Sequence, residues 1–407
     1  MDRRDFLKSA SVAGAISLLP LARRAAAEEG AAGESDAPPS TESGRAYAEL
    51  GRTLQEVEAG YLSASRGITR PGDLSDGHRF LLHVLQTALV LKLESDPERP
   101  VFRRIVSPTQ KLLGDNPDAI YFEAAIRGDR RYRIRGNNAG AVYTSFTIEA
   151  GGVEGGYPER TDGARNDTQF EIRSDEGYEL LLGPDVSGPN TLKLPGDART
   201  VTTRSYFETP RSAAADPIRA VPISIEPVED PGPAPDPDDA SIARSIRRVI
   251  AYLRGNTLLQ PMPDPASRPS WVSAIPNQFN PPAKPGEMAF AAVDNAYTMA
   301  PYALGPDHAL VIEGRFPRCR FANVVLWNRY LQSYDYSSRQ ISLNRAQTRL
   351  EPDGRYRIAI ASRDPGVPNW IDTAGRPSGL VYWRFLLPEG EIETPSARVV
   401  PLSELRA

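Results

Sequence analysis

The sequence contains one cysteine and three histidines among 407 residues, and both shortages limit what the protein can be. Because Cys319 is the only cysteine, no disulfide can form within the chain, and stability has to come from a packed core. Its two arginine neighbours would favour a thiolate, although a half-buried strand thiol is the commoner situation. His78 and His83 are five residues apart, so they do not share a helix face as metal ligands one turn apart do. We therefore expect no metal site and no cofactor.

A basic field, long apolar runs and familiar catalytic motifs are also missing. The formal net charge of −4 argues against nucleic acid as a partner. The chain has no G-x-S-x-G nucleophile motif, no phosphate-binding P-loop and no dinucleotide fingerprint after an expected strand. The stretch from Gly151 to Gly156 is glycine-rich but lacks a following helix, so we interpret it as a flexible loop. No run is long enough to span a bilayer comfortably, so stable membrane insertion is not expected.

The N-terminus carries the most specific functional signal in the chain. Residues Arg3 to Lys8 form a twin-arginine motif, an apolar run extends from Ala10 to Ala22, and Ala25 to Ala27 form a small-residue cleavage site. We interpret residues 1–27 as a signal peptide for the twin-arginine export machinery. The mature protein is then expected to be periplasmic or extracellular, with residues 28–44 as a disordered spacer.

Hydrophobic spacing predicts helices followed by strands in the first half of the mature chain. Helices are expected from Tyr47 to Ala64 and, after a break at Pro71, from Gly77 to Glu94, with Asp76 as the N-cap. Alternating strands then follow between residues 121 and 207, separated by Gly, Asn, Asp and Pro clusters. We assign residues 45–228 to these helices and a first β-sandwich module.

The second half of the chain repeats that order. Residues 229–237 form a proline-rich acidic linker, and a helix is expected to run from Asp238 or Ser241 to Arg254. Strands resume after an irregular stretch, so residues 238–407 form a helix plus a second module. The sequence thus predicts a mainly β fold with flanking helices and two similar antiparallel, jelly-roll-like β-sandwich modules.

An internal repeat supports the two modules. Four features recur in the same order, and they are Gly136 with Gly314, Tyr178 with Tyr356, Asn190 with Asn369, and Arg204 with Arg384. Features present in both copies are expected to belong to the scaffold. Trp370, Asp372 and Trp383 occur only in the second copy, which makes them better functional candidates.

The candidate site is the segment from Asp353 to Pro388, in which a polar and aromatic loop joins two expected strands. Asp372 and Asp335 are the candidate catalytic carboxylates, since a positioned carboxylate can act as an acid or a base. The candidate ligand-binding residues are Trp370, Asn369, Arg376, Arg384, Tyr334 and Trp383. Structural alternatives stand beside these roles, because Asn369 can pin a turn and tryptophans commonly lie in a sandwich core.

The segments DPGVPNWIDTAGRPSGLVYWRFLLPEGE, LWNRYLQSYDY and SLNRAQ resemble the secreted bacterial family called domain of unknown function 1214, which often occurs with domain 1254. The resemblance is specific from Asp294 to Glu391 and looser from Gly114 to Glu208. It implies a jelly-roll-like β-sandwich, sometimes oligomeric, with no agreed activity. Where that family commonly has a histidine after N-W-L-D-T-A-G, this chain has Arg376, so it lacks a histidine that could transfer a proton at that position.

Three functions remain open from the sequence. The first is an exported protein that binds a glycan or another polyhydroxylated small molecule through aromatic faces and Arg, Asp and Asn side chains. The second is a carbohydrate-acting hydrolase or lyase with a carboxylate pair drawn from Asp372, Asp364, Asp335 and Glu313. The third is a structural envelope protein, with homo-oligomers possible, for which a buried Trp370 and no sizeable pocket are expected. Whether the protein is an enzyme is left undecided.

Overall fold

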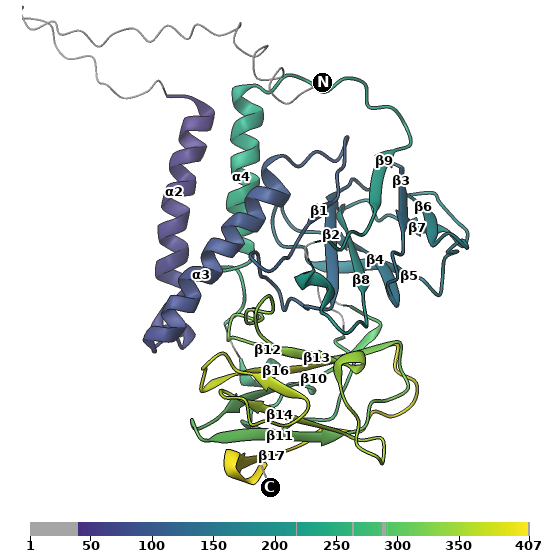
Figure 1. The fold of residues 1–407 in the computed structure, drawn as a ribbon. Coiled ribbons are helices and arrows are strands. Elements are labelled where there is room, and N and C mark those ends of the chain that lie inside the picture. Colours follow the sequence, from purple (N-terminus) through teal and green to yellow (C-terminus); the bar gives the residue numbers. More distant parts are fainter. Residues whose placement is uncertain (1–39, 217, 263, 287–289, 291, 406–407) are drawn as a thin grey trace, which may run out of the picture. The chain divides into compact units, whose positions relative to one another are not determined.

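Two β-sandwich modules follow one another in the computed structural model, which describes residues 40–405 except 217, 263, 287–289 and 291 (Figure 1). In the first module a five-stranded sheet of order β1-β2-β8-β4-β5 faces a four-stranded sheet of order β7-β6-β3-β9. Its strands are β1 (Arg103–Arg104), β2 (Ala119–Ala125), β3 (Tyr132–Asn137), β4 (Tyr143–Ala150), β5 (Arg160–Asn166), β6 (Gly177–Gly183), β7 (Thr191–Lys193), β8 (Ala198–Tyr206) and β9 (Ile223–Pro227).

The second module has sheets of order β10-β16-β12-β13 and β15-β14-β11-β17. Its strands are β10 (Asn295–Ala303), β11 (His308–Gly314), β12 (Phe321–Trp327), β13 (Ser342–Asn344), β14 (Tyr356–Ala361), β15 (Trp370–Asp372), β16 (Ser378–Leu386) and β17 (Ser396–Pro401). Strands β10 to β17 therefore repeat the connectivity of β2 to β9, including one parallel pair in each module, β6 with β7 and β14 with β15. The predicted mainly β fold with two similar modules is confirmed.

A tyrosine that crosses a glycine marks the same point in both modules. Gly136 on β3 pairs with Tyr178 on β6, and Gly314 on β11 pairs with Tyr356 on β14. A methyl group added to either glycine would lie 2.3 Å from the hydroxyl oxygen of the paired tyrosine. Each glycine thus lets a buried aromatic ring lie flat across the neighbouring strand, and both pairs belong to the repeated scaffold.

Each module has its own apolar core between its two sheets. The first contains Phe146 and Leu180, and the second contains Ile358 and Trp383. Trp383 is fully buried, and its ring stacks on Tyr356 with 5.0 Å between the ring centroids. The expected ligand-binding role of Trp383 is therefore wrong, because its ring has no free face to offer.

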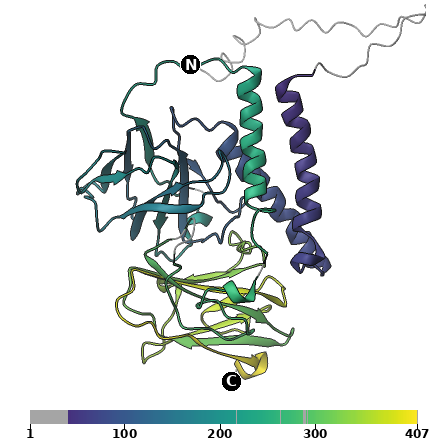
Figure 2. The same ribbon diagram turned by 180° about the vertical axis from the view of Figure 1, so that it is seen from behind.

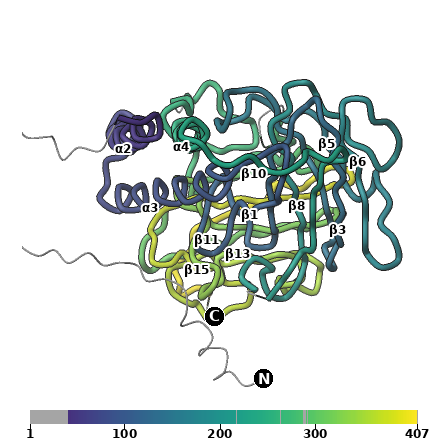
Figure 3. Tube along the Cα trace, turned by 90° about the horizontal axis from the view of Figure 1, so that it is seen from above, coloured from purple at the N-terminus to yellow at the C-terminus, as the bar shows by residue number. Residues whose placement is uncertain are grey.

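Three α-helices of the described residues accompany the sandwiches, namely α2 (Glu42–Tyr61), α3 (Pro71–Ala88) and α4 (Asp239–Gly255). Helices α2 and α4 lie side by side, as the front, rear and top views show (Figures 1, 2 and 3). Asp238, one of the two predicted N-cap residues, caps α4, and it forms a capping box with Ser241. Among the described residues, no helix has the length and apolar character needed to cross a membrane.

Several boundaries differ from the predictions. Pro71 occupies the first turn of α3 instead of breaking a helix, because proline fits where no intrahelical N–H bond is needed. Helix α3 therefore starts earlier than expected and ends in a π-helical turn, Leu89–Leu93. The predicted spacer reaches too far, since Thr41 already caps α2. The predicted signal peptide, residues 1–27, and most of the spacer lie outside the described residues.

The equivalent sheets of the two modules contact each other. Tyr143 and Tyr206 from the first module pack in one buried cluster with Phe321 and Leu386 from the second. The strand pairing makes Tyr143 equivalent to Phe321 and Tyr206 equivalent to Leu386. The contact therefore joins the same face of each module, and it places both central strands, β8 and β16, beside one shared interior space.

Candidate functional site

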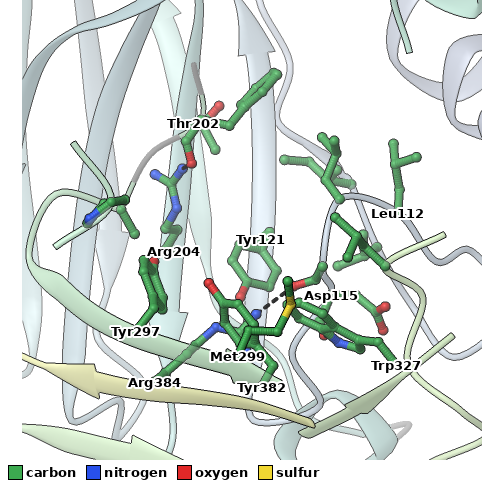
Figure 4. A pocket seen from close by; sticks show the side chains of 18 of the residues that line it. Leu112, Asp115, Tyr121, Thr202, Arg204, Tyr297, Met299, Trp327, Tyr382 and Arg384 are labelled. Carbon is green, nitrogen blue, oxygen red and sulfur yellow. Dashed lines mark hydrogen bonds between the residues drawn. The ribbon is translucent and has the colours of Figure 1, made fainter. Parts of the chain in front are cut away.

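A cavity of about 340 Å³ lies between the two contacting sheets (Figure 4). The first module contributes the side chains of Tyr121, Thr202 and Arg204, and the second contributes those of Tyr297, Met299, Trp327, Tyr382 and Arg384. Leu112, Asp115 and Tyr252, which lie outside both sheets, complete parts of the wall. Most of this surface is aromatic or aliphatic, with a few polar groups among the rings.

Two arginines from equivalent positions face this cavity. Arg204 lies on β8 opposite Tyr121, and Arg384 lies on β16 opposite Tyr297. The repeat identified both arginines, but the expectation that repeated residues belong only to the scaffold does not hold for them. Arg384 was a candidate ligand-binding residue and does line the cavity, whereas Arg204 was not among the candidates.

Arg384 is buried with part of its guanidinium unbonded. Its side chain is 4% exposed, and Nη2 donates to the Gly114 carbonyl oxygen at 2.6 Å. Nη1 is buried and has no hydrogen-bond partner among the described residues. The guanidinium carbon lies 4.7 Å from the Tyr382 ring centroid and 5.0 Å from that of Trp327, so ring faces partly replace water around the charge.

Arg204 is equally buried but better bonded. Its Nη1 donates to Thr147 Oγ1 at 2.7 Å, and its Nη2 donates to the Phe290 carbonyl oxygen at 3.1 Å. In the described part of the chain, no carboxylate forms an ion pair with either arginine. Burying a charge without a counter-charge costs several kcal/mol. Two such arginines in one wall therefore lower the stability of the folded protein unless a ligand compensates them.

Two further cavity groups have unused hydrogen-bonding capacity. Trp271 Nε1 and Thr202 Oγ1 are buried in the wall without a partner among the described residues. An indole N–H can only donate, and a hydroxyl can donate as well as accept. Together with Arg384 Nη1, the unbonded polar groups of the wall are therefore able to serve a ligand that brings acceptors.

The acidic groups of the wall are already satisfied. Asp115 accepts hydrogen bonds from the Ser333 backbone N–H, at 2.8 Å, and from the Ser333 hydroxyl. Glu123 forms a buried ion pair with Lys92. Neither carboxylate of the wall forms an ion pair with Arg204 or Arg384, because Glu123 pairs with Lys92 and Asp115 is hydrogen-bonded by the neutral groups of Ser333.

The loop that holds Arg384 is fixed by a buried lysine. Lys111 Nζ donates to the Ser333 carbonyl oxygen at 3.0 Å and to its hydroxyl at 2.8 Å, and burial lowers the pKa of Lys111 to about 8. Gly114 has a φ of 73°, and a methyl group there would lie 2.7 Å from the Trp327 ring. These contacts tie residues 111–115 to the second module and set the position of the Gly114 carbonyl.

The two candidate catalytic carboxylates lie elsewhere and have internal partners. Asp372 pairs with Arg339 at 2.6 Å and accepts from the Ala374 backbone N–H at 2.7 Å. Asp335 accepts from Ser337 N and Ser338 Oγ, and these bonds, led by that of Ser338, hold its pKa below the usual value. Neither residue is in the cavity wall, so the predicted carboxylate site is not assembled there.

The remaining candidates fix the loop from residue 364 to residue 376. Asn369, at a φ of 59°, accepts from Arg349 N at 2.8 Å, in the same way that Asn190 accepts from Glu171 N at 3.0 Å. The half-buried Trp370 donates through Nε1 to the Ala361 carbonyl at 3.1 Å. These bonds match the structural alternative for Asn369, and neither residue lines the cavity.

Arg376 and Tyr334 join the second module to helix α3. Arg376 forms an ion pair with Asp76, and its guanidinium lies 5.0 Å from the Tyr334 ring centroid. Tyr334 is 5% exposed, and its hydroxyl bonds to that of Tyr302 at 2.8 Å. Asp76 is thus an ion-pair partner instead of the predicted helix cap. Of the eight predicted site residues, only Arg384 lines the cavity.

The surroundings of Cys319 and His83, the other reactive side chains noted in the sequence, do not favour reactivity. Cys319 lies just before β12, half-buried, and burial raises its pKa to about 11 despite nearby Arg345. His83 accepts from the Lys111 backbone N–H at 3.2 Å, and burial lowers its pKa. Among the described residues, no group of three or more His, Cys, Asp or Glu side chains is placed to hold a metal ion.

Comparisons with known proteins give a structural relative without an assigned activity. No family model matches the chain, and no curated protein matches it. The crystal structure of an uncharacterized protein from Burkholderia cenocepacia is similar, with a TM-score of 0.74 and 26% identity over 89% of this chain and 98% of that one. The VPA0106 protein from Vibrio parahaemolyticus matches at a TM-score of 0.46 and 12% identity over 80% and 98%, which is too remote to support an inference. The fold is therefore shared with at least one bacterial protein, over nearly the whole chain.

Proposed function

We propose that this is an exported binding protein whose small-molecule ligand occupies the cavity between the two modules. One observation carries the proposal, namely a space of about 340 Å³ whose wall includes Arg384, a buried arginine with one guanidinium nitrogen that has no hydrogen-bond partner among the described residues. Small-molecule sites typically have volumes of about 300–1,000 Å³, with apolar and aromatic walls and few polar groups. The wall around Arg384 has this composition.

The place of action is part of the same proposal. The twin-arginine motif at Arg3 and Arg4, the apolar run and the small-residue site support export from the cytoplasm. The second module carries the segments that resemble the domain of unknown function 1214 family, and we propose that the chain is a relative of it. Binding in the cavity would require both modules, because each supplies part of the wall.

The cavity favours a less polar ligand than the sequence suggested. A glycan offers many hydroxyl groups, and burying them requires a matching number of acceptors and donors in the wall. Asp115 and Glu123 are already engaged with protein partners, whereas rings and aliphatic side chains make up most of the surface. We therefore propose an aromatic or alicyclic small molecule in place of a polyhydroxylated one.

The two other functions receive less support. The four carboxylates considered for an enzyme all have protein partners, since Asp364 caps a turn at Gly366 and Glu313 lies near Arg357 and Arg398. A purely structural role does not account for a cavity of this size or for the unbonded buried donors in its wall. We therefore keep ligand binding as the conclusion.

A matched pair of methionine variants tests the cavity. Met299 lines it, whereas Met262 is 49% exposed on the surface, so Met299→Trp fills the cavity and Met262→Trp changes the same side chain elsewhere. The purified protein is screened by thermal shift against aromatic and alicyclic compounds, both neutral and anionic, and against neutral sugars. Compounds that stabilise the wild type are expected to stabilise Met262→Trp equally and to lose their effect on Met299→Trp. Equal shifts in Met299→Trp, or shifts with sugars alone, would contradict the proposal.

A further inference from the structure

The charges of the cavity wall point to the chemistry of its ligand, and this step rests on the proposed function. Two buried arginines face the cavity without a carboxylate partner among the described residues, while both wall carboxylates have partners. Asp118 is a buried acidic group whose pKa is influenced by the charge of Arg384. It is held by Asn323 and Asn344 and forms no ion pair with Arg384. The positive charge of Arg384 is therefore left for a ligand to neutralise.

We propose that the ligand is an aromatic or alicyclic carboxylate whose oxygens are bound by Arg384 Nη1 and neighbouring donors. An arginine remains charged when buried, and it presents its N–H groups in a planar fork that matches a carboxylate. Nη1 is the one buried nitrogen of Arg384 that has no partner among the described residues. Trp271 Nε1 and Thr202 Oγ1 are the other unbonded groups of the same wall.

Neighbouring phenols reinforce the preference for an acceptor. Tyr121, Tyr297 and Tyr382 line the cavity, and burial raises the pKa of each hydroxyl. These hydroxyls stay protonated at neutral pH, so they are able to donate and do not add negative charge. An anionic head group therefore meets donors and a positive charge at this end of the cavity.

The body of the ligand is set by the rest of the wall. Leu112, Leu331 and Met299 supply aliphatic surface, and Trp327 supplies a large ring. Figure 4 labels Met299 and Trp327 among the side chains of the wall, and the Trp327 ring centroid lies 5.0 Å from the guanidinium carbon of Arg384. A flat or compact hydrocarbon body would be buried here, while its carboxylate reaches the arginine.

Arg204 has a supporting role in this arrangement. Its Nη1 and Nη2 groups already donate to Thr147 and to the Phe290 carbonyl. It contributes charge to the cavity without an equivalent free nitrogen. Arg384 is therefore expected to make the direct contact, and Arg204 to strengthen the positive field in which the contact forms.

Matched ligand pairs on the unmodified protein give the decisive test. Isothermal titration compares 2-naphthoate with 2-naphthamide, and cyclohexanecarboxylate with cyclohexanecarboxamide, since each pair differs in the anionic group and keeps the hydrocarbon body. The carboxylate is expected to bind about tenfold or more tightly than the amide, because a charged acceptor strengthens the bond to a buried guanidinium. Phenylphosphonate beside benzoate separates a carboxylate from a phosphate-like anion.

Arginine variants locate the contact. Arg384→Met removes the charge, and Arg384→Lys keeps the charge without the fork. Arg339→Met is the control, because Arg339 pairs with Asp372 outside the cavity. The carboxylate preference is expected to disappear in Arg384→Met, to weaken in Arg384→Lys and to persist in Arg339→Met, while the amide binds all four proteins alike.

The outcomes separate the inference from the proposed function. Equal affinities within each pair for the wild type, or a preference retained in Arg384→Met, would overturn the carboxylate assignment. A preference for phenylphosphonate would overturn it as well and assign a phosphate-like anion. Amides that bind the wild type but not Met299→Trp would leave the cavity as the binding site while removing the anion from its ligand. The wild-type pairs decide the matter even if an arginine variant fails to fold.

Discussion

Arg204 and Arg384 occupy the same position in two copies of one module, yet their bonds differ. Arg204 donates to a side chain of its own sheet and to a backbone carbonyl, whereas Arg384 donates to the Gly114 carbonyl, and its Nη1 has no partner in the part of the chain that the structure describes. The repeated strand positions bring both charges to the shared space. Their different partners show that the two modules differ in how many guanidinium N–H groups remain available to a ligand.

The scaffold glycines should respond alike in both modules and give the largest effect. Gly136→Ala and Gly314→Ala each place a methyl group 2.3 Å from the hydroxyl oxygen of a tyrosine that is 1% exposed. We expect each variant to lose about 3 kcal/mol of unfolding free energy, measured by chemical denaturation, because a buried ring and a strand would have to move apart.

The control for these glycines is on helix α2. A methyl group at Gly51 meets no atom within 4 Å, so Gly51→Ala is expected to stabilise the protein by up to about 1 kcal/mol. A loss in Gly136→Ala that is absent from Gly314→Ala would show that the two modules do not share this scaffold contact.

Replacing the two equivalent arginines should reduce the stability of the protein by unequal amounts, and we expect effects of intermediate size. Arg204→Met leaves the Phe290 carbonyl without its donor and removes the bond to Thr147, so we expect a loss of about 2 kcal/mol in the ligand-free protein. Arg384→Met loses one hydrogen bond but also removes an uncompensated buried charge, so its loss should stay below about 1 kcal/mol. Denaturation of both variants without ligand measures the difference. A larger loss for Arg384→Met would mean that this arginine serves mainly to hold the structure.

Protonation of Asp118, which lies outside the cavity wall, is expected to make the stability of the protein depend on pH. Burial raises the pKa of Asp118 from 3.8 to about 6. A carboxyl group whose pKa is higher in the folded state stabilises the fold below its unfolded pKa, and this contribution is lost as the pH rises through the folded value. The stability of Asp118→Asn relative to the wild type should therefore increase by about 2 kcal/mol between pH 4 and pH 6. A difference that does not change with pH in denaturation curves would contradict this.

The loop unique to the second module should give the smallest effect. Asp372→Asn weakens the pair with Arg339, whose side chain is 48% exposed, and we expect a loss of about 1 kcal/mol at most. Ligand-induced thermal shifts should be unchanged in Asp372→Asn and in Trp370→Ala, because neither residue lines the cavity. A reduced shift would return the loop to consideration as a binding site.

The fold followed from signals that are local or repeated along the chain. Alternation and turn residues indicated most of the strands, and the spacing of Gly, Tyr, Asn and Arg indicated two modules with equal connectivity. No strand was predicted at β1, β5, β9 or β17, or at the three-residue strands β7, β13 and β15. Strands of three residues are too short to produce a period.

The site was only partly accessible from the sequence, for a physical reason. Neighbouring residues on a strand face opposite sides of the sheet, so Trp383 and Arg384 could not share a site. Tyr382 and Arg384 line the cavity, whereas Trp383 and Phe385 stack within the sandwich core. The face of β16 that carries Tyr382 and Arg384 is covered only because the two modules pack against each other. Neither periodicity nor composition predicts that packing.

The contact between equivalent faces has a consequence for how a ligand is oriented. If the same module met a second, identical copy through this face, both halves of the enclosed space would be alike, and a bound molecule would meet the same groups in either direction. Joining the modules in one chain removes that constraint, since Tyr143 and Tyr206 now face Phe321 and Leu386. A single chain can thus present different groups at the two ends of the enclosed space, which two identical chains could not do.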